Sequence, residues 1–203
     1  MADINAVLIL AGGQSSRMGS DKALLTLPSG QTLLDFHLAN AHTLGVPILL
    51  ADNNKRFTHT TPCQTIQDYL PCDDTGKGQG ALCAITSGLQ YLNQDGFLLV
   101  VSCDNLLNIN KIAQILTHTT AQVGYLKNNK DYPLLGVYHT SILPDLMAFL
   151  TTDNRSVMGF LKQITCQTFD IDDDWQQLAN FNTTAEFNHA LESFYESFNP
   201  SGH

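Results

Sequence analysis

The chain has few positive charges. Of its 203 residues only 10 are Lys or Arg, against 19 Asp or Glu, which gives a formal net charge of −9. A negative field of this size repels nucleic acids and anionic membranes. We therefore expect neither a polynucleotide nor a membrane partner. A bound nucleotide would have to be attracted by a local group of cations or by a metal ion.

Long apolar runs and paired cysteines are also absent. No apolar stretch approaches the ~18 residues of a membrane-spanning helix, and Asp3 and Asn5 interrupt the only apolar run at the N-terminus, so no signal segment is expected. The five cysteines are odd in number and include no Cys-x-x-Cys pair, which disfavours zinc ribbons and a disulfide framework. These absences predict a cytoplasmic protein with reduced thiols.

Apolar residues, in contrast, make up 43% of the chain, enough for a sizeable core at this length. Short apolar runs alternate with segments of helical periodicity, which is typical of the α/β class. The expected strands are 6–11, 46–50, 63–66, 97–101, 121–126, 134–139 and 168–171. The expected helices are 32–44, 81–92, 111–119, 141–150, 156–164 and a last one from a capping box within 181–186 to about residue 198. We expect a single domain over residues 1–203, with 199–203 as a frayed tail.

The most informative stretch is residues 6–25, AVLILAGGQSSRMGSDKALL. Its apolar start predicts a buried strand that stops at Gly12-Gly13, where the backbone can turn or lie against a ligand. The polar residues that follow could form an anion-binding concavity, and Arg17 and Lys22 add two cations. This order is typical of a phosphate site, but the spacing is neither that of a P-loop nor that of a dinucleotide-binding fingerprint.

Polar residues also follow other expected strands. Asn53, Asp68 and Asp104 each come shortly after an apolar run, at the strand ends where α/β sheets bind ligands. Ordinary turns and caps explain such residues about as well. Gly80 closes a glycine-rich loop before a helix, a weak signal for anion binding. The acidic run 172–174 is interpreted as a solvated turn rather than a metal site.

Residues 10–25 resemble the opening signature of the nucleotidyltransferases that transfer NMP from NTP, Leu-Ala-Gly-Gly-x-Ser-x-Arg-Met-Gly-x-Asp-Lys. Within them the stretch looks most like the molybdenum cofactor guanylyltransferases, the MobA family. Further blocks follow in the family's order: Gln67-Asp68, Gly80-Ala81-Leu82, Cys103-Asp104, Tyr132-Pro133-Leu134 through Asp153-x-Arg155-Ser156, and Asn180-Phe181-Asn182-Thr183. The resemblance implies a three-layer Rossmann-like nucleotidyltransferase fold with a mostly parallel central sheet and helices on both faces.

The activity that the resemblance implies is Mg²⁺-dependent transfer of GMP from GTP to the terminal phosphate of molybdenum-molybdopterin, with release of pyrophosphate. Asp104 is then expected to bind Mg²⁺, and Lys22 and Arg17 to hold the phosphates. Residues expected to bind the nucleotide or the pterin are Leu10, Ala11, Gly12, Gly13, Asn53, Asp68, Gly80, Arg155 and Asn182. Expected protein partners are those that deliver the molybdenum cofactor or mature molybdoenzymes.

Several positions depart from the family pattern. Ala81 and Thr184 replace prolines, Ala84 replaces a glycine, and Asn105-Leu106 stands where Met/Thr-Pro is expected. These departures affect loop stiffness and substrate placement more than the fold. Two alternatives stay open at this point: a related nucleotidyltransferase with another base or acceptor, such as a cytidylyl or sugar-phosphate transferase, and a non-catalytic GTP-binding module.

Overall fold

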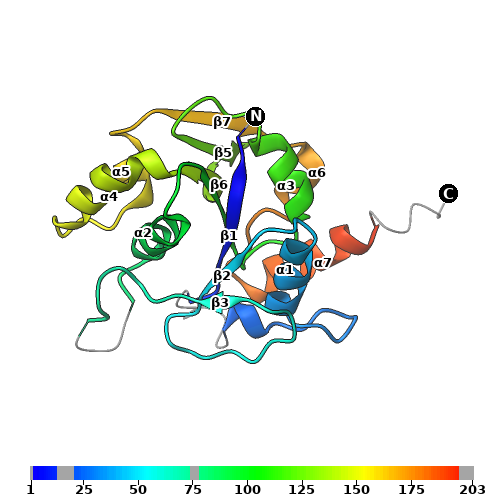
Figure 1. The fold of residues 1–203 in the computed structure, drawn as a ribbon. Helices are drawn as coiled ribbons and strands as arrows, with labels where there is room; N and C mark the ends of the chain where they lie inside the picture. Colours follow the sequence, from blue (N-terminus) through cyan, green and yellow to red (C-terminus); the bar gives the residue numbers. More distant parts are fainter. Residues whose placement is uncertain (1, 13–20, 74–77, 197–203) are drawn as a thin grey trace.

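The computed structural model describes residues 2–12, 21–73 and 78–196, and its seven described strands form one sheet (Figure 1). The strand order is β3-β2-β1-β4-β6-β5-β7. Of the described strands, β6 alone runs antiparallel to its neighbours, and all other pairs are parallel. The strands are β1 (Ile4–Leu10), β2 (Ile48–Ala51), β3 (Gln64–Thr65), β4 (Phe97–Ser102), β5 (Val123–Lys127), β6 (Asp131–His139) and β7 (Cys166–Asp170).

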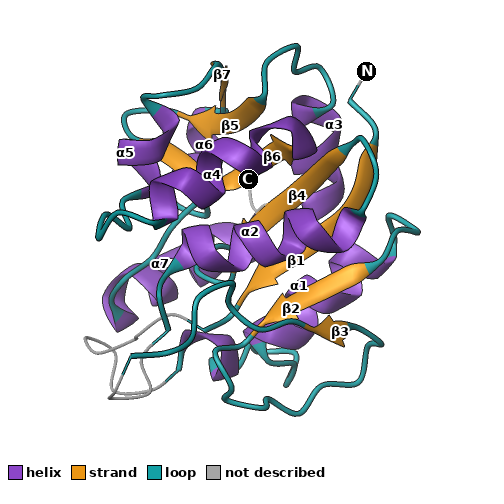
Figure 2. Cartoon of the chain, turned by 60° about the vertical axis from the view of Figure 1, so that its left-hand side comes forward, coloured by secondary structure: helices purple, strands orange, loops and turns teal. Residues whose placement is uncertain are grey.

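Helices cover both faces of the sheet (Figure 2). The helices α1 (Leu33–His42), α3 (Ile109–Leu116) and α7 (Thr184–Glu196) pack on one face. The helices α2 (Ala81–Leu92), α4 (Leu143–Leu150) and α5 (Val157–Leu161) pack on the other. Shorter helical segments are η1 (Lys22–Leu24), η2 (Thr140–Ile142) and α6 (Asp173–Gln176). The architecture is three layers, as the resemblance implied.

The alternation of side chains along the central strands produces these two cores. In β1, Val7 and Ile9 belong to the core under α1 and α3, whereas Ala6 and Leu8 belong to the core under α2. A strand covered on both faces needs apolar residues at successive positions. This is why β1 and β4 read as unbroken apolar runs in the sequence.

The chain reverses its direction of travel across the sheet between β1 and β4. From β1 it proceeds to β2 and β3 on one side, and it then returns to place β4 on the other side of β1. Open α/β sheets bind ligands in the crevice outside the carboxyl ends of the strands at such a switch point. The antiparallel course of β6 brings the turn between β5 and β6 to this same edge. The fold therefore gathers Leu10, Ser102 and residues 128–130 at one edge.

Two local expectations need correction. The run Asp172–Asp174 is exposed as expected, but Asp173 and Asp174 form the first turn of α6, where acidic side chains favour the positive end of the helix dipole. Strand β6 begins at Asp131 rather than at Leu134. Its pairing with β5 is irregular between Tyr125 and Leu126, whose partners are Gly136 and Tyr132. Pro133 lies in this irregularity, where the N–H that proline lacks is not needed to pair with β5.

Three further observations concern the thiols, the helices and the C-terminal tail. All five cysteines are free thiols. Within the described ranges, no helix has the length and apolar character that crossing a membrane requires. The tail 199–203 lies outside the described residues.

Candidate active site

A cavity of about 410 Å³ lies at the carboxyl edge of the sheet, against the ends of β1, β2 and β4. It is at the switch point of the strand order, and its size is within the range of small-molecule sites. Residues predicted from the sequence make up much of its wall: Leu10, Ala11, Gly12, Lys22, Asn53, Asp68, Gly80, Asp104 and Asn182. Gly13 and Arg17 lie outside the described residues.

Arg155 does not take part in the described wall of this cavity. Its guanidinium Nη1 donates to the carbonyl oxygens of Leu150 at 3.3 Å and Thr152 at 2.5 Å, just past the end of α4. The Leu150 carbonyl belongs to the last turn of α4, which lacks intrahelical donors, and the Thr152 carbonyl lies just beyond the helix. Arg155 therefore contacts the C-terminal end of α4, and its contact with the pterin stays a prediction.

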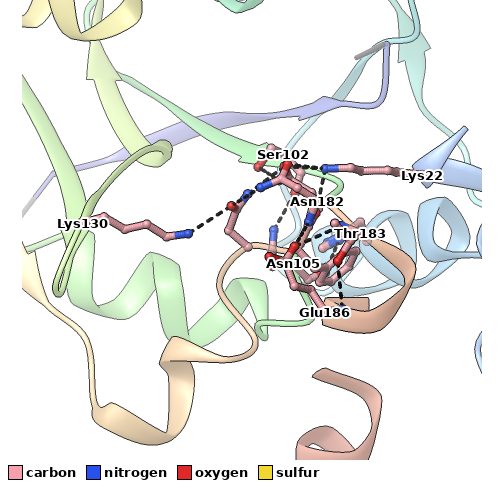
Figure 3. A network of polar contacts seen from close by, with 11 residues as sticks. Lys22, Ser102, Asn105, Lys130, Asn182, Thr183 and Glu186 are labelled. Carbon is pink, nitrogen blue, oxygen red and sulfur yellow. Dashed lines mark hydrogen bonds and ion pairs between the residues drawn. The ribbon is translucent and has the colours of Figure 1, made fainter. Parts of the chain in front are cut away.

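Lys22 and Asp104 form the centre of a polar network at one side of the cavity (Figure 3). The Lys22 Nζ lies 3.3 Å from Asp104 Oδ2, 2.7 Å from the Phe181 carbonyl oxygen and 2.9 Å from Asn182 Oδ1. Its side chain is only 17% exposed, so the network largely encloses this lysine. Lys22 lies between the carboxylate and the segment 181–182 that precedes α7.

Further hydrogen bonds hold the Asp104 carboxylate. Its Oδ1 accepts from the Ser102 hydroxyl at 2.5 Å, and its Oδ2 accepts from Asn180 Nδ2 at 2.8 Å. The Asp104 carbonyl also accepts from the Phe181 N–H at 2.9 Å. This carboxylate therefore has one fixed position at the end of β4.

The donor set at Asp104 fits a magnesium ion only as an open site. Among the described residues, no group of three His, Cys, Asp or Glu side chains could enclose a metal. Magnesium is usually held by one or two carboxylates, water and substrate phosphates. Since a carboxylate oxygen has about two lone-pair sites, Asp104 Oδ1 can accept from Ser102 and still bind a cation. Asp104 could thus hold a magnesium ion whose other ligands come from water and the nucleotide.

The start of α7 positions Asn182 at the cavity. The Glu186 carboxylate accepts from the backbone N–H groups of Asn182 at 2.6 Å and Thr183 at 3.0 Å. The Glu186 N–H in turn donates to Thr183 Oγ1 at 3.2 Å. This reciprocal pair is the predicted capping box, which is confirmed. The hydrogen bond from the Asn182 N–H lowers the pKa of Glu186, because it favours the ionised carboxylate that accepts in the box.

Asn53 and Asp68 lie together on the opposite side of the cavity. A Cβ atom on Gly78 would stand 2.4 Å from Asn53 Oδ1 and 2.9 Å from Asp68 Oδ2, so only glycine fits between them. The Asp68 Oδ2 accepts from the Gln79 N–H at 3.1 Å, which leaves Oδ1 for a ligand. Burial raises the pKa of Asp68 above its ordinary value. Gly80 has a φ of +92° as the N-cap of α2, a conformation that favours glycine.

The conformation of Asn53 is imposed by its buried neighbour Asp52. The two carboxylate oxygens of Asp52 accept from the N–H groups of Asn54 and Arg56, each at 3.0 Å. Asn53, Asn54 and Arg56 all have positive φ, at 53°, 61° and 53°. Left-handed residues of this kind cost free energy and persist where surrounding contacts require them. Asp52 therefore supports the loop that presents Asn53 to the cavity.

The end of β1 is already engaged in the sheet. The Leu10 carbonyl accepts from the Cys103 N–H at 3.1 Å, and the Ala11 N–H donates to the Ala51 carbonyl at 3.0 Å. A carbonyl oxygen has two lone pairs, so Leu10 retains one for a ligand. The contribution of Leu10 to base binding stays a prediction, limited to one hydrogen bond accepted by its carbonyl oxygen.

Asn105 supports the turn that carries Asp104. It is fully buried; its Nδ2 donates to the Ser102 carbonyl at 2.5 Å, and its Oδ1 accepts from the Leu107 N–H at 2.9 Å. Its own carbonyl lies 3.0 Å from Nε2 of His37, a buried residue of α1 whose pKa is lowered by burial to about 4. These hydrogen bonds stabilise the turn in the region where the family pattern has a proline.

The sequence did not single out every residue of the site. Ser102 and Asn180 contact Asp104 directly, and Gly78 separates Asn53 from Asp68. Asn180 was visible only as the first residue of the Asn-x-Asn-Thr block. Lys130 also belongs to the network, since its Nζ donates to Asn180 Oδ1 at 3.2 Å. No motif marked Lys130, because only the fold brings the β5–β6 turn to this edge.

The chain is similar to known proteins in sequence and in fold. A probable molybdenum cofactor guanylyltransferase of Flavobacterium johnsoniae is 26% identical over 188 residues, covering 89% of this chain and 93% of that protein. The crystal structure of molybdopterin-guanine dinucleotide biosynthesis protein A from Archaeoglobus fulgidus superposes with a TM-score of 0.73 at 17% identity, covering 94% of this chain and 99% of that one.

The same fold occurs with another nucleotide. The inositol-1-phosphate CTP transferase of T. maritima superposes with a TM-score of 0.64 at 11% identity, covering 97% of this chain and 98% of that one. Fold alone therefore does not determine the base. Residues 7–167 match the model of the MobA-like NTP transferase domain. The chain accordingly belongs to the family of MobA-like NTP transferase domains and is a nucleotidyltransferase.

Proposed function

We propose that this protein transfers GMP from GTP to the terminal phosphate of molybdenum-molybdopterin, forming the guanine dinucleotide cofactor and pyrophosphate. The observation that carries the proposal is the cavity itself, which has hydrogen-bond acceptors on one side and a lysine–carboxylate pair on the other. The name of the Flavobacterium johnsoniae relative agrees with this assignment.

The base would bind on the side of Asn53 and Asp68. Guanine presents two donors, N1–H and the exocyclic amine, so its site needs acceptors. Asp68 Oδ1, which accepts no hydrogen bond from the part of the chain that the structure describes, and the second lone pair of the Leu10 carbonyl can supply them. Adenine presents an acceptor at N1 and would face these acceptors unfavourably. A buried site that leaves polar groups unpaired rejects such an analogue strongly.

The phosphates would bind on the side of Lys22 and Asp104. Phosphoryl transfer requires positioning and charge neutralisation more than covalent chemistry. When Asp104 holds a magnesium ion, that ion would neutralise phosphate charge. Lys22, which already lies 3.3 Å from Asp104, would place its ammonium against the departing pyrophosphate. Asn182, which lines the cavity beside Lys22, would contact the acceptor.

The acceptor needs no general base. The terminal phosphate of molybdopterin is an anion at neutral pH and attacks the α-phosphate of GTP in line, with pyrophosphate as the leaving group. The buried His37 is neutral at this pH, since burial lowers its pKa to about 4. The protein's contribution is then to hold two anions together against their repulsion.

The proposal is tested by pyrophosphate release with GTP, Mg²⁺ and molybdopterin carrying molybdenum. We expect release that depends on all three, and a guanine dinucleotide product by mass spectrometry. Parallel reactions with CTP and ATP should be slower by at least ~10² in kcat/KM. A preference for CTP would assign the protein to a cytidylyl reaction. Release with a sugar phosphate but not with molybdopterin would assign it another acceptor.

A further inference from the structure

We infer that Lys130 is a positioning residue of this site, which sets the orientation of the Asn180 side-chain amide so that Asn180 can hold Asp104. The inference rests on the proposed function, because it assigns Lys130 a part in the same reaction. Lys130 lies in the turn between β5 and β6, far along the chain from Asn180 and Asp104. Its side chain points into the network (Figure 3).

The Lys130 side chain is directed by two contacts although the residue is exposed. Its Nζ lies 5.2 Å from the centroid of the Tyr132 ring, which favours a cation over the ring face. The same Nζ donates to Asn180 Oδ1 at 3.2 Å. In Figure 3 Lys130 and Lys22 approach the network from opposite sides. The two lysines therefore reach different members of the network.

The hydrogen bonds of Asn180 are consistent with only one orientation of its amide. Its Oδ1 accepts from Lys130 Nζ at 3.2 Å and from Asn182 Nδ2 at 2.9 Å, while its Nδ2 donates to Asp104 Oδ2 at 2.8 Å. Reversing the amide would place an oxygen against the carboxylate and an NH₂ group against two donors. All three hydrogen bonds would be lost. A hydrogen bond from an ammonium is stronger than one from a neutral donor, so Lys130 biases this choice.

The oriented amide completes a closed ring of side chains around Asp104. Lys22 Nζ donates to Asn182 Oδ1 at 2.9 Å, Asn182 Nδ2 donates to Asn180 Oδ1, and Asn180 Nδ2 donates to Asp104 Oδ2. The Lys22–Asp104 ion pair at 3.3 Å closes the ring. Lys22, Asn182 and Asn180 each donate to the next side chain, and Asp104 accepts from Asn180 and Lys22, so a reversed amide at Asn180 affects both Asn182 and Asp104. Lys130 stabilises the ring by holding the Asn180 amide in this orientation.

The hairpin offers a matched control for charge. Lys127, at the end of β5, is exposed like Lys130. Among the described residues, the side-chain partners of Asn180 are Lys130, Asp104 and Asn182, and Lys127 is not one of them. Lys130→Met and Lys127→Met remove the same charge from the same hairpin. Only the first removes the hydrogen bond to the amide, and Lys130→Arg restores a charged donor.

The decisive experiment is a double-mutant cycle between Lys130→Met and Asn180→Ala, measured as kcat in pyrophosphate release and as Mg²⁺-dependent GTP binding by titration calorimetry. Changing an outer partner of a metal ligand typically costs roughly 10- to 100-fold. For Lys130→Met we expect roughly 10-fold losses of kcat and of the Mg²⁺ affinity in the GTP complex. Lys127→Met and Lys130→Arg should have near-wild-type values. Adding Lys130→Met to Asn180→Ala should cause no further loss.

Two results would overturn the inference. Losses that multiply in the double variant would show that Lys130 acts independently of Asn180, as a direct contact to the acceptor would. A Lys130→Met protein that matches Lys127→Met in both measurements would remove Lys130 from the site. Both results require an active wild type. A wild type that releases no pyrophosphate from GTP and molybdopterin contradicts the proposed function instead, so the two failures are distinguishable.

Discussion

The Lys22 ammonium lies 3.3 Å from the Asp104 carboxylate and 2.7 Å from the carbonyl of Phe181, so it joins the loop after β1 to the segment before α7. Lys22→Ala should therefore lower kcat by about 10²–10³, as the loss of a preorganised charge contact typically does. It should also reduce the free energy of unfolding by about 1–3 kcal/mol through the lost charged hydrogen bonds. Denaturant unfolding and pyrophosphate release measure the two effects. Lys162→Ala, at an exposed lysine after α5, is the control and should change neither.

Asp104→Asn tests the carboxylate. The substitution keeps the shape but removes the charge that a hard dication requires; its amide oxygen can still accept from Asn180, and its NH₂ group can donate to the Ser102 hydroxyl. We expect activity to be lost while GTP binding, measured by calorimetry, weakens only in part. Activity in the variant equal to that of the wild type, or wild-type activity that persists in excess chelator, would exclude Asp104 as the metal ligand.

Asp68 should make GTP binding sensitive to acid. Because Asp68 Oδ2 already accepts from the Gln79 N–H, Oδ1 is the oxygen offered to guanine, and it accepts most strongly when the carboxyl group is ionised; burial raises the pKa of Asp68. Protonation therefore begins at a higher pH than for an ordinary aspartate, and GTP affinity should fall as the pH is lowered toward that raised pKa. Asp68→Asn has no carboxyl to titrate. The difference between the two pH profiles of GTP affinity isolates the effect from protonation of the nucleotide, and coincident profiles would remove Asp68 from the site.

His37 should make the fold sensitive to acid for a different reason. Its Nδ1 is buried without a hydrogen-bond partner among the described residues, so a second proton there would find no acceptor. The pKa falls from 6.5 to about 4 on burial. The unfolded chain thus takes up the proton first, and the free energy of unfolding should drop as the pH falls from 6.5 to 4. The slope is at most ~1.4 kcal/mol per pH unit.

The control for this effect is His37→Gln, which is neutral at every pH and can still donate to the Asn105 carbonyl. Urea unfolding of both proteins between pH 7 and 4 gives the comparison. We expect the wild type to lose more stability than the variant over this range. Parallel losses would show that other groups cause the acid sensitivity.

Ala81→Pro should stabilise the protein. Ala81 is the first residue of α2, a position whose N–H has no intrahelical acceptor. The ψ of the preceding Gly80 is 176°, in the extended range that proline requires. We expect a gain of about 0.4–1 kcal/mol in the free energy of unfolding. The same substitution at Ala84, one turn into the helix, should instead cost about 3 kcal/mol or more. A loss at Ala81 would mean that the backbone there does not suit proline.

The sequence predicted best those elements whose burial is uniform. Helix α2 has the predicted bounds, Ala81–Leu92, and β4 extends one residue past the predicted 97–101. Both follow from side chains that the core requires at fixed intervals. Strand β6 was predicted to begin at Leu134 but begins at Asp131, and the irregular pairing that accommodates Pro133 depends on the neighbouring strand β5.

The site was predictable where a local motif carried it and not where tertiary structure assembled it. Lys22 and Asp104 belong to blocks that can be read along the chain. Arg155 belongs to such a block too; its guanidinium contacts the C-terminal end of α4, and its pterin contact stays a prediction. Lys130 reaches Asn180 only because β6 runs antiparallel and returns the hairpin to the carboxyl edge. Contacts of this kind depend on the topology of the sheet, which local sequence motifs do not reveal.

The switch point between β1 and β4 also divides the site by order along the chain. The residues proposed for the base, from Leu10 to Asp68, all precede Asp104. Those proposed for the acceptor side, Asn182 with its support Asn180 and Lys130, all follow it. The segment before Asp104 thus determines which base is bound, and the segment after it determines which acceptor is bound. We expect exchanges of the segment after residue 104 between relatives to change the acceptor while preserving the nucleotide.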